Sequence, residues 1–172
     1  MPPDPDLRSL RVAALLNTSS GSCDASSRAA LLEILQEAGI QPTEVWDVAG
    51  KEVDQALDAA TEAGIDVLIV LGGDGTIRSA AQRSDQDGPL LVPLPGGTMN
   101  MLPRALYGAR PWRQALADTL KAPVIQPVHA GQVGSHRFFA LASSGAPRFW
   151  PKPASPFARE IWWARSARAS PR

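Results

Sequence analysis

The stretch Val67-Leu68-Ile69-Val70-Leu71-Gly72-Gly73-Asp74-Gly75-Thr76 decides the fold of this chain. The apolar run at its start would bury both faces of a strand, which is typical of the central strands of a parallel sheet. The run leads directly into three glycines, one acid and one hydroxyl. Open α/β sheets bind ligands at the carboxyl ends of their strands. We therefore expect a buried strand over residues 66–71, followed by a ligand-binding turn.

Short apolar runs and stretches of helical period alternate on both sides of this strand. This alternation is the pattern of βαβ units stacked around a parallel sheet. It predicts an α/β domain with helices on both faces of the sheet over residues 1–122. The expected strands are 12–16, 43–48 and 90–94, and the expected helices are 27–38, 53–63 and one that starts at Pro111.

The pattern changes after residue 122. Two apolar segments, 124–133 and 136–143, flank Gly134-Ser135, which predicts a hairpin. We interpret residues 123–146 as the beginning of a β-rich second domain. Residues 147–172 contain five prolines, six basic residues and one acid, so we expect them to be a disordered tail. The alternative is that the tail attaches the chain to an anionic membrane.

Composition excludes several classes of protein. The 172 residues include 44% hydrophobic and 20% charged residues with a formal net charge of zero, which argues against a nucleic-acid binder. No apolar run approaches the ~20 residues that span a bilayer. The start of the chain does not read as a secretory signal, and the single Cys23 excludes an internal disulfide. The cytoplasm is the expected compartment.

The turn after the buried strand has the chemistry of a phosphate site. Gly72, Gly73 and Gly75 would let the backbone approach a polyphosphate, and Thr76 would cap the next helix, whose N–H groups face the anion. Asp74 would be repelled by phosphates unless it faces a cation or accepts a proton. A glycine-rich turn with a solvated aspartate and no ligand would contain the same residues. This stretch alone does not distinguish such a turn from a phosphate site.

Two further polar loops follow neighbouring strands. One runs from Asn17 through Ser20 and Gly21, and the other contains Gly97, Thr98 and Asn100. Three such loops on one rim of a sheet are what a nucleotide cleft requires. The chain lacks the Walker A motif, the protein-kinase catalytic loop and the dinucleotide-binding glycine motif after its first strand. Those families of nucleotide-binding proteins are thereby excluded.

The glycine loops together identify a family resemblance. Gly72-Gly73-Asp74-Gly75-Thr76, followed by Gly97-Thr98-Met99-Asn100, resembles the catalytic-domain signature of the diacylglycerol kinase and sphingosine kinase superfamily of lipid kinases. The resemblance implies a three-layer, Rossmann-like fold of the NAD kinase and phosphofructokinase type. It marks Asp74 as catalytic, names no metal ligand, and marks these nucleotide-binding candidates: Asn17, Ser20, Gly21, Gly72, Gly73, Gly75, Thr76, Gly97, Thr98 and Asn100.

The resemblance also implies a reaction. ATP and Mg²⁺ would bind, and the γ-phosphoryl group would pass to a lipid hydroxyl at a membrane surface, the inner surface for a cytoplasmic enzyme. Met101 stands where the family commonly has an aspartate, and the chain holds little of the acceptor domain, so we expect it to be a poor kinase by itself. Two alternatives stay open: an NAD kinase-like small-molecule kinase, and a nucleotide-binding fragment without turnover.

Overall fold

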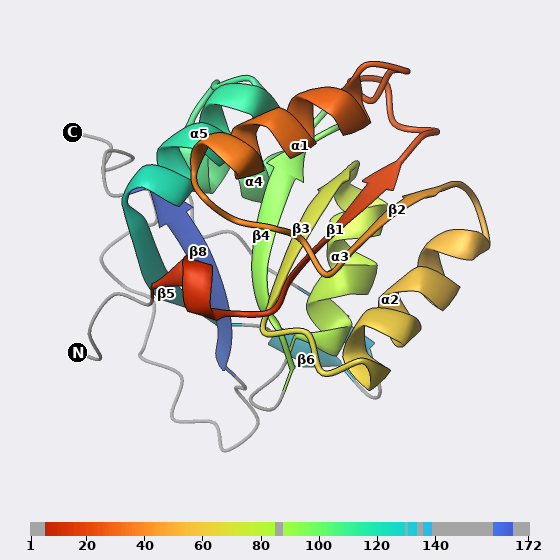
Figure 1. Ribbon diagram of the computed structural model, residues 1–172. Helices are drawn as coiled ribbons and strands as arrows, with labels where there is room; N and C mark the ends of the chain where they lie inside the picture. The colour runs from red at the N-terminus through yellow and green to blue at the C-terminus, as the bar shows by residue number, and fades with distance from the viewer. Residues whose placement is uncertain (1–5, 85–87, 130, 134–135, 139–159, 167–172) are drawn as a thin grey trace.

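A computed structural model describes residues 6–84, 88–129, 131–133, 136–138 and 160–166 of the chain (Figure 1). The helical elements are a 3-10 turn η1 (Leu7–Ser9) and the α-helices α1 (Ser27–Glu37), α2 (Glu52–Glu62), α3 (Asp74–Arg83), α4 (Met101–Tyr107) and α5 (Trp112–Lys121). The strands are β1 (Val12–Asn17), β2 (Glu44–Val48), β3 (Val67–Gly72), β4 (Leu90–Pro95), β5 (Pro123–His129), β6 (Gly131–Val133), β7 (His136–Phe138) and β8 (Glu160–Ser166).

Six of these strands form one sheet in the order β2-β1-β3-β4-β8-β5. The strands β1 to β4 pair in parallel, and every residue of β3 is buried, as the apolar run predicted. The four strands and the helices α1, α2 and α5 lie within one or two residues of their predicted positions. The predicted α/β class with a parallel sheet and alternating helices is confirmed.

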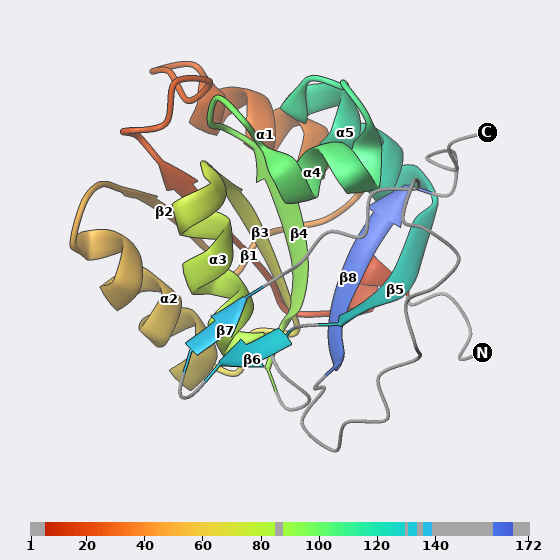
Figure 2. The ribbon, with the colours of Figure 1, turned by 180° about the vertical axis from the view of Figure 1, so that it is seen from behind.

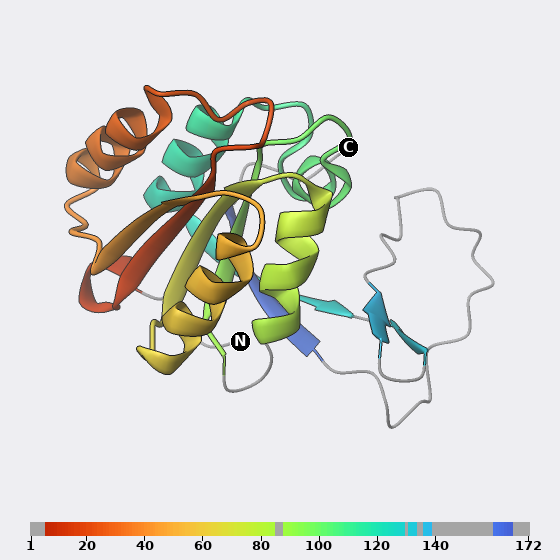
Figure 3. The ribbon, with the colours of Figure 1, turned by 90° about the vertical axis from the view of Figure 1, so that its right-hand side faces the viewer.

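The helices cover both faces of the sheet. Helices α1 and α5 pack together on one face, and α2 and α3 pack together on the other (Figures 1 and 3). Leucines of these helices contribute to the apolar core. The fully buried ones are Leu31 and Leu35 of α1, Leu57 of α2 and Leu116 of α5. Burying one such side chain contributes about 1.5–3 kcal/mol. This core fixes where the strands end, and therefore where the loops after them lie.

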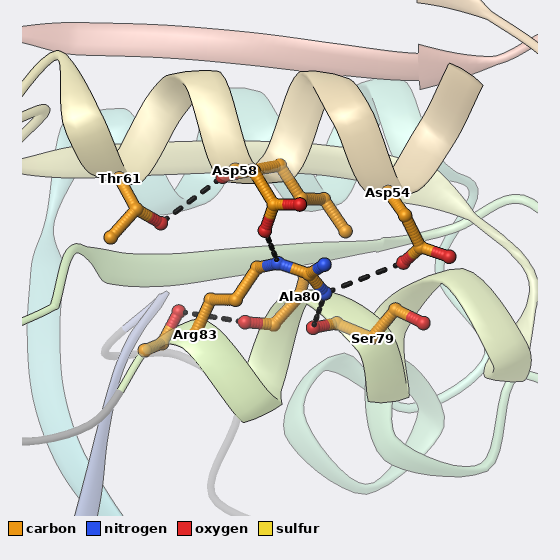
Figure 4. A network of polar contacts seen from close by, with 8 residues as sticks. Asp54, Asp58, Thr61, Ser79, Ala80 and Arg83 are labelled. Atoms are coloured by element: carbon orange, nitrogen blue, oxygen red, sulfur yellow. Dashed lines mark hydrogen bonds and ion pairs between the residues drawn. The ribbon is translucent and has the colours of Figure 1, made fainter. Parts of the chain in front are cut away.

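A charged contact on the surface joins α2 to α3 (Figure 4). The Arg83 guanidinium donates through Nε to Asp58 at 2.6 Å and through Nη1 to Asp54 at 3.3 Å. Its Nη1 also donates to the carbonyl of Ser79, one turn earlier in α3. The hydrogen bond from Arg83 holds the pKa of Asp58 below its ordinary value. Arg83 thus bridges two neighbouring helices outside the apolar core.

The last described strand departs from the expectation for the tail. Residues 160–166, which we expected to be disordered, form β8, which pairs with β4 in parallel and with β5 in the antiparallel sense. The physical reason is that this segment contains no proline, while Ile161, Trp162 and Trp163 favour strands. Residues 147–159 and 167–172 lie outside the described residues.

The predicted hairpin forms a second, small sheet. Strands β6 and β7 pair in the antiparallel sense, with Val133 opposite His136, on either side of residues 134–135 (Figure 2). Strand β5, which we expected to belong to this hairpin, joins the main sheet instead. The predicted division into domains over 1–122, 123–146 and 147–172 stays a prediction. Among the described residues, no helix is long and apolar enough to span a membrane.

Candidate functional site

The three predicted loops meet at one edge of the sheet. Because β1, β3 and β4 run in parallel, their carboxyl ends lie side by side, and hydrogen bonds join the loops that follow them. The Asn17 side chain donates to the Thr76 hydroxyl at 2.8 Å. The Ser22 N–H donates to the Gly96 carbonyl, and the Gly96 N–H donates to the Gly72 carbonyl, both at 2.9 Å. The structure therefore brings the sequence-predicted loops together.

Asp74 links the turn after β3 to the loop after β4. One carboxylate oxygen accepts the Asn100 N–H at 3.0 Å, and the other accepts the Met101 N–H at 2.7 Å. These are the N–H groups at the start of α4, which have no partner inside the helix. Asp74 therefore has a structural role that the sequence did not reveal. Met101 enters this contact through its backbone, while its side chain is 55% exposed.

Asn100 closes the second glycine loop on itself. Its side-chain oxygen accepts the Gly97 N–H at 2.7 Å, and its side-chain nitrogen donates to the Gly97 carbonyl at 2.6 Å. Its φ of 49° lies in the left-handed region, which asparagine tolerates better than most residues. Asn100 is also buried. Both polar atoms of the Asn100 side chain thus stabilise the conformation of this loop.

The glycines of the site fall into two groups. A Cβ on Gly72 would lie 2.6 Å from the Thr76 Cβ, and a Cβ on Gly97 would lie 2.7 Å from the Gly73 Cα. Gly96, which the sequence analysis did not single out, is equally close to the backbone of Gly72, at 2.8 Å. Gly96 and Gly97 allow the loop after β4 to pack backbone against backbone on the turn after β3, and Gly72 leaves room for the Thr76 side chain.

The second group of glycines faces open space. A Cβ would meet nothing within 4 Å at Gly21 or Gly75, and at Gly73 it would lie 3.6 Å from the nearest atom, an ordinary contact. Neighbouring protein atoms therefore do not explain the absence of a side chain there. These glycines are the ones that leave room for a ligand near the backbone.

Thr76 does not cap α3, in contrast to our expectation. The helix begins at Asp74, and Gly73 is the N-cap, with extended backbone angles and no side chain to bond the first N–H groups. Thr76 already lies in the first turn, where it is buried and bonded to Asn17. The uncapped N–H groups and the positive end of the helix dipole favour an anion at this position.

The remaining predicted residues lie around this centre. Ser20 is buried and donates its N–H to the Asn17 carbonyl, whereas Thr98 is exposed on the second loop. Burial raises the pKa of the nearby Cys23 thiol above its ordinary value, which lowers its reactivity at neutral pH. In the described part of the chain, no three acidic, histidine or cysteine side chains gather as a metal site would require.

This chain is similar to known proteins of one family. The family model of the diacylglycerol kinase catalytic domain matches residues 11–133. A diacylglycerol kinase of Bacillus subtilis strain 168 is 32% identical over 120 residues, which cover 68% of this chain and 39% of the relative.

Solved structures from Bacillus anthracis strain Sterne share the fold. One, provisionally named as a diacylglycerol kinase, is 25% identical with a TM-score of 0.56, over 70% of this chain and 44% of that one. Another, named as a diacylglycerol kinase, is 24% identical with a TM-score of 0.55, over 70% of this chain and 46% of that one. This chain thus spans less than half the length of each of these relatives.

Proposed function

This chain belongs to the diacylglycerol kinase catalytic-domain family, and from that premise we propose that it forms the nucleotide-binding part of an ATP-dependent lipid kinase. The proposed reaction passes the γ-phosphoryl group of ATP to a lipid hydroxyl at a membrane surface. The observation that carries the proposal is the meeting of three loops, from β1, β3 and β4, beside the uncapped start of α3.

The start of α3 provides the phosphate-binding part of the site. Its first N–H groups point away from the helix, and the bare Gly73 and Gly75 leave them accessible. Asn17 fixes Thr76 in the first turn, so the backbone donors are held in place before any ligand binds. Such preorganised donors stabilise charge that develops during phosphoryl transfer.

The residues fit a magnesium ion that is bound mainly through the nucleotide. Mg²⁺ usually keeps several waters and takes one or two carboxylates together with substrate phosphates, so a dedicated cluster of acids is not required. Asp74 supplies a carboxylate where the loops that follow β1, β3 and β4 meet. When bound, the ion would neutralise charge on the phosphates.

We propose that Asp74 serves the reaction chiefly as a positioning residue. Its oxygens already accept two N–H groups at 2.7 and 3.0 Å, which hold the β4 loop against the α3 turn. Each oxygen keeps further lone-pair capacity toward magnesium or a water bound to it. This assignment gives Asp74 an effect on nucleotide binding and on stability as well as on turnover.

The test is the binding of Mg-ATP to the 172-residue chain by calorimetry, because binding does not depend on the acceptor. We expect saturable binding that Gly73→Val weakens at least ~10-fold, since a branched side chain would obstruct the backbone donors. Ala59→Val, which adds a branched side chain on the exposed face of α2, is the control. A folded chain that binds no ATP would disprove the proposal.

Transfer of labelled phosphate then identifies the acceptor. Diacylglycerol, a sphingoid base and NAD are offered in parallel to the same chain. Preferential labelling of diacylglycerol supports the proposed reaction, and we expect the rate to be low because the chain spans 39% of its curated relative. Preferential labelling of NAD would replace the lipid kinase with a small-molecule kinase.

A further inference from the structure

We propose that two exposed methionines, Met99 and Met101, form a surface that binds an anionic membrane. Among the residues that the structure describes, these are the large apolar side chains that are exposed, at 64% and 55%. Met99 lies in the loop after β4, and Met101 is the first residue of α4 (Figure 2). The inference rests on the proposed lipid kinase function, and it identifies the face of the domain that meets the membrane.

The backbone on either side of Asn100 holds the two methionines at the surface. Asn100 itself is buried, and its side chain bonds both the N–H and the carbonyl of Gly97. The Asp74 carboxylate accepts the Met101 N–H at 2.7 Å. The polar residue of this stretch is therefore buried while the two apolar side chains beside it lie in solvent. This reverses the usual distribution of polar and apolar side chains, which marks the stretch as a contact surface.

Helix α4 extends the exposed surface beyond the loop. Its inner side carries Leu102 and Leu106, which are both buried. Met101 and Arg104 are three residues apart, so they lie on one side of the helix, and both are exposed. An exposed side that combines apolar side chains with a cation is suited to the surface of an anionic membrane.

The charge of the segment that carries the methionines favours a membrane over a second copy of the chain. Residues 96–113 include three arginines and no aspartate or glutamate. Anionic lipids give a membrane a negative surface potential, which attracts these cations. A second copy would bring the same three arginines to a symmetric contact, where like charges repel. We therefore assign the surface to an anionic bilayer.

Membrane contact at Met101 would bring the nucleotide loops close to the lipid. The Met101 N–H donates directly to Asp74, which is the first residue of α3. The uncapped start of α3 is the proposed phosphate-binding part of the site. A phosphoryl group held there would lie close to the layer of lipid headgroups, where an acceptor hydroxyl is found. Methionine suits such a contact because its flexible, unbranched side chain adapts to irregular surroundings.

The first experiment sediments the full chain with vesicles of phosphatidylcholine and phosphatidylglycerol, without diacylglycerol or ATP. We expect Met99→Ser and Met101→Ser each to weaken binding at least ~3-fold, and the double variant at least ~10-fold, because an apolar contact is lost. Met99→Leu and Met101→Leu are the matched controls and should bind like the parent chain, since they keep an apolar side chain of similar volume. Both methionines are exposed, so serine does not disturb the core. Undiminished binding of the double variant would overturn the proposal, whichever other segment carries it.

The second experiment tests the contribution of charge. We expect weaker binding to vesicles of phosphatidylcholine alone, and we expect Arg104→Gln to weaken binding to the mixed vesicles at least ~3-fold. Lys121→Gln, which removes one charge from the last residue of α5, is the control and should change little. Equal losses in the two variants would show that binding follows net charge alone, and would overturn the assignment to this surface.

Sedimentation velocity without vesicles tests the competing occupant of the surface. We expect the parent chain and Met99→Ser to sediment alike at every concentration. A dimer of the parent chain that Met99→Ser abolishes would assign the surface to a second copy of the chain and overturn the proposal.

Titration with Mg-ATP separates this inference from the kinase proposal. We expect Met99→Ser to lose vesicle binding and to bind Mg-ATP like the parent chain. If the variant loses both, the Met99 side chain belongs to the nucleotide site and the membrane surface is disproved. A parent chain that binds vesicles through the methionines but binds no ATP would disprove only the kinase proposal. A parent chain that binds ATP but no vesicles would disprove only the membrane surface.

Discussion

At the scale of single residues, the glycines of the site lack a side chain for two different reasons. Gly97 has no side chain because the Gly73 backbone lies where its Cβ would be, at 2.7 Å. Gly75 has no side chain although its surroundings are open. The sequence shows both as glycines in polar loops and could not separate them, because a close approach between two loops depends on their packing. It did predict that the loops would meet, since all of them follow parallel strands.

This difference predicts opposite effects of the same substitution. We expect Gly97→Ala to lower the free energy of unfolding by about 1–3 kcal/mol, because backbone atoms must move. We expect Gly75→Ala to raise it by about 0.5–1 kcal/mol, because alanine favours a helix more than glycine does, and yet to weaken Mg-ATP binding. Urea unfolding and calorimetry measure the two quantities. A Gly75→Ala chain that is stabilised and binds ATP normally would remove Gly75 from the nucleotide site.

The Asp74 carboxylate should matter for stability as well as for the reaction. Asp74→Asn leaves one acceptor oxygen for two N–H groups and turns an amide NH₂ toward one of them. We expect a loss of about 1–3 kcal/mol in the free energy of unfolding, together with loss of phosphoryl transfer. Glu62→Gln, which removes one charge from an exposed site, is the control. Unchanged stability in the Asp74 variant would contradict its positioning role.

At the scale of elements, helices and strands were predictable where a local pattern specifies them. Strands β1, β3 and β4 are apolar runs that end at Asn17, Gly72 and Pro95, β2 contains residues that favour strands between its two acids, and α1, α2 and α5 have helical period. Strand β8 was missed because arginines and nearby prolines made its surroundings read as a tail. Its partners β4 and β5 are distant in sequence, so no local signal marks the pairing.

The contact between α2 and α3 predicts an acid-sensitive stability. Because Arg83 lowers the folded-state pKa of Asp58, this interaction stabilises the fold above the ordinary aspartate pKa, about 4, and is lost as the pH falls through the lower folded-state pKa. We expect Arg83→Met to lower the Tm near neutral pH. In acid, we expect the Tm of the variant to approach that of the parent chain. Arg78→Met, on the same helix, is the control. A difference in Tm that does not vary with pH would contradict the contact.

At the scale of the whole molecule, β8 completes the main sheet between β4 and β5. Proline in a central strand removes a backbone donor and costs about 3 kcal/mol or more. We therefore expect Ala164→Pro to destabilise the chain strongly in urea, while Ala164→Ser, which keeps the N–H, changes little. Ala164 pairs with Ile125 of β5. Equal stability of the two variants would show that residues 160–166 are not part of the sheet.

The position of β8 also has a consequence for the newly made chain. Leu91 of β4 pairs with Trp163 of β8 although 72 residues separate them. A ribosome that adds roughly 5–20 residues per second needs about 4–14 seconds to synthesise that interval. During this time the edge of β4 has no β8 beside it, and an open strand edge can pair with other chains. The nascent protein therefore passes through a period, set by translation speed, in which a chaperone that shields this edge would raise the yield of folded protein.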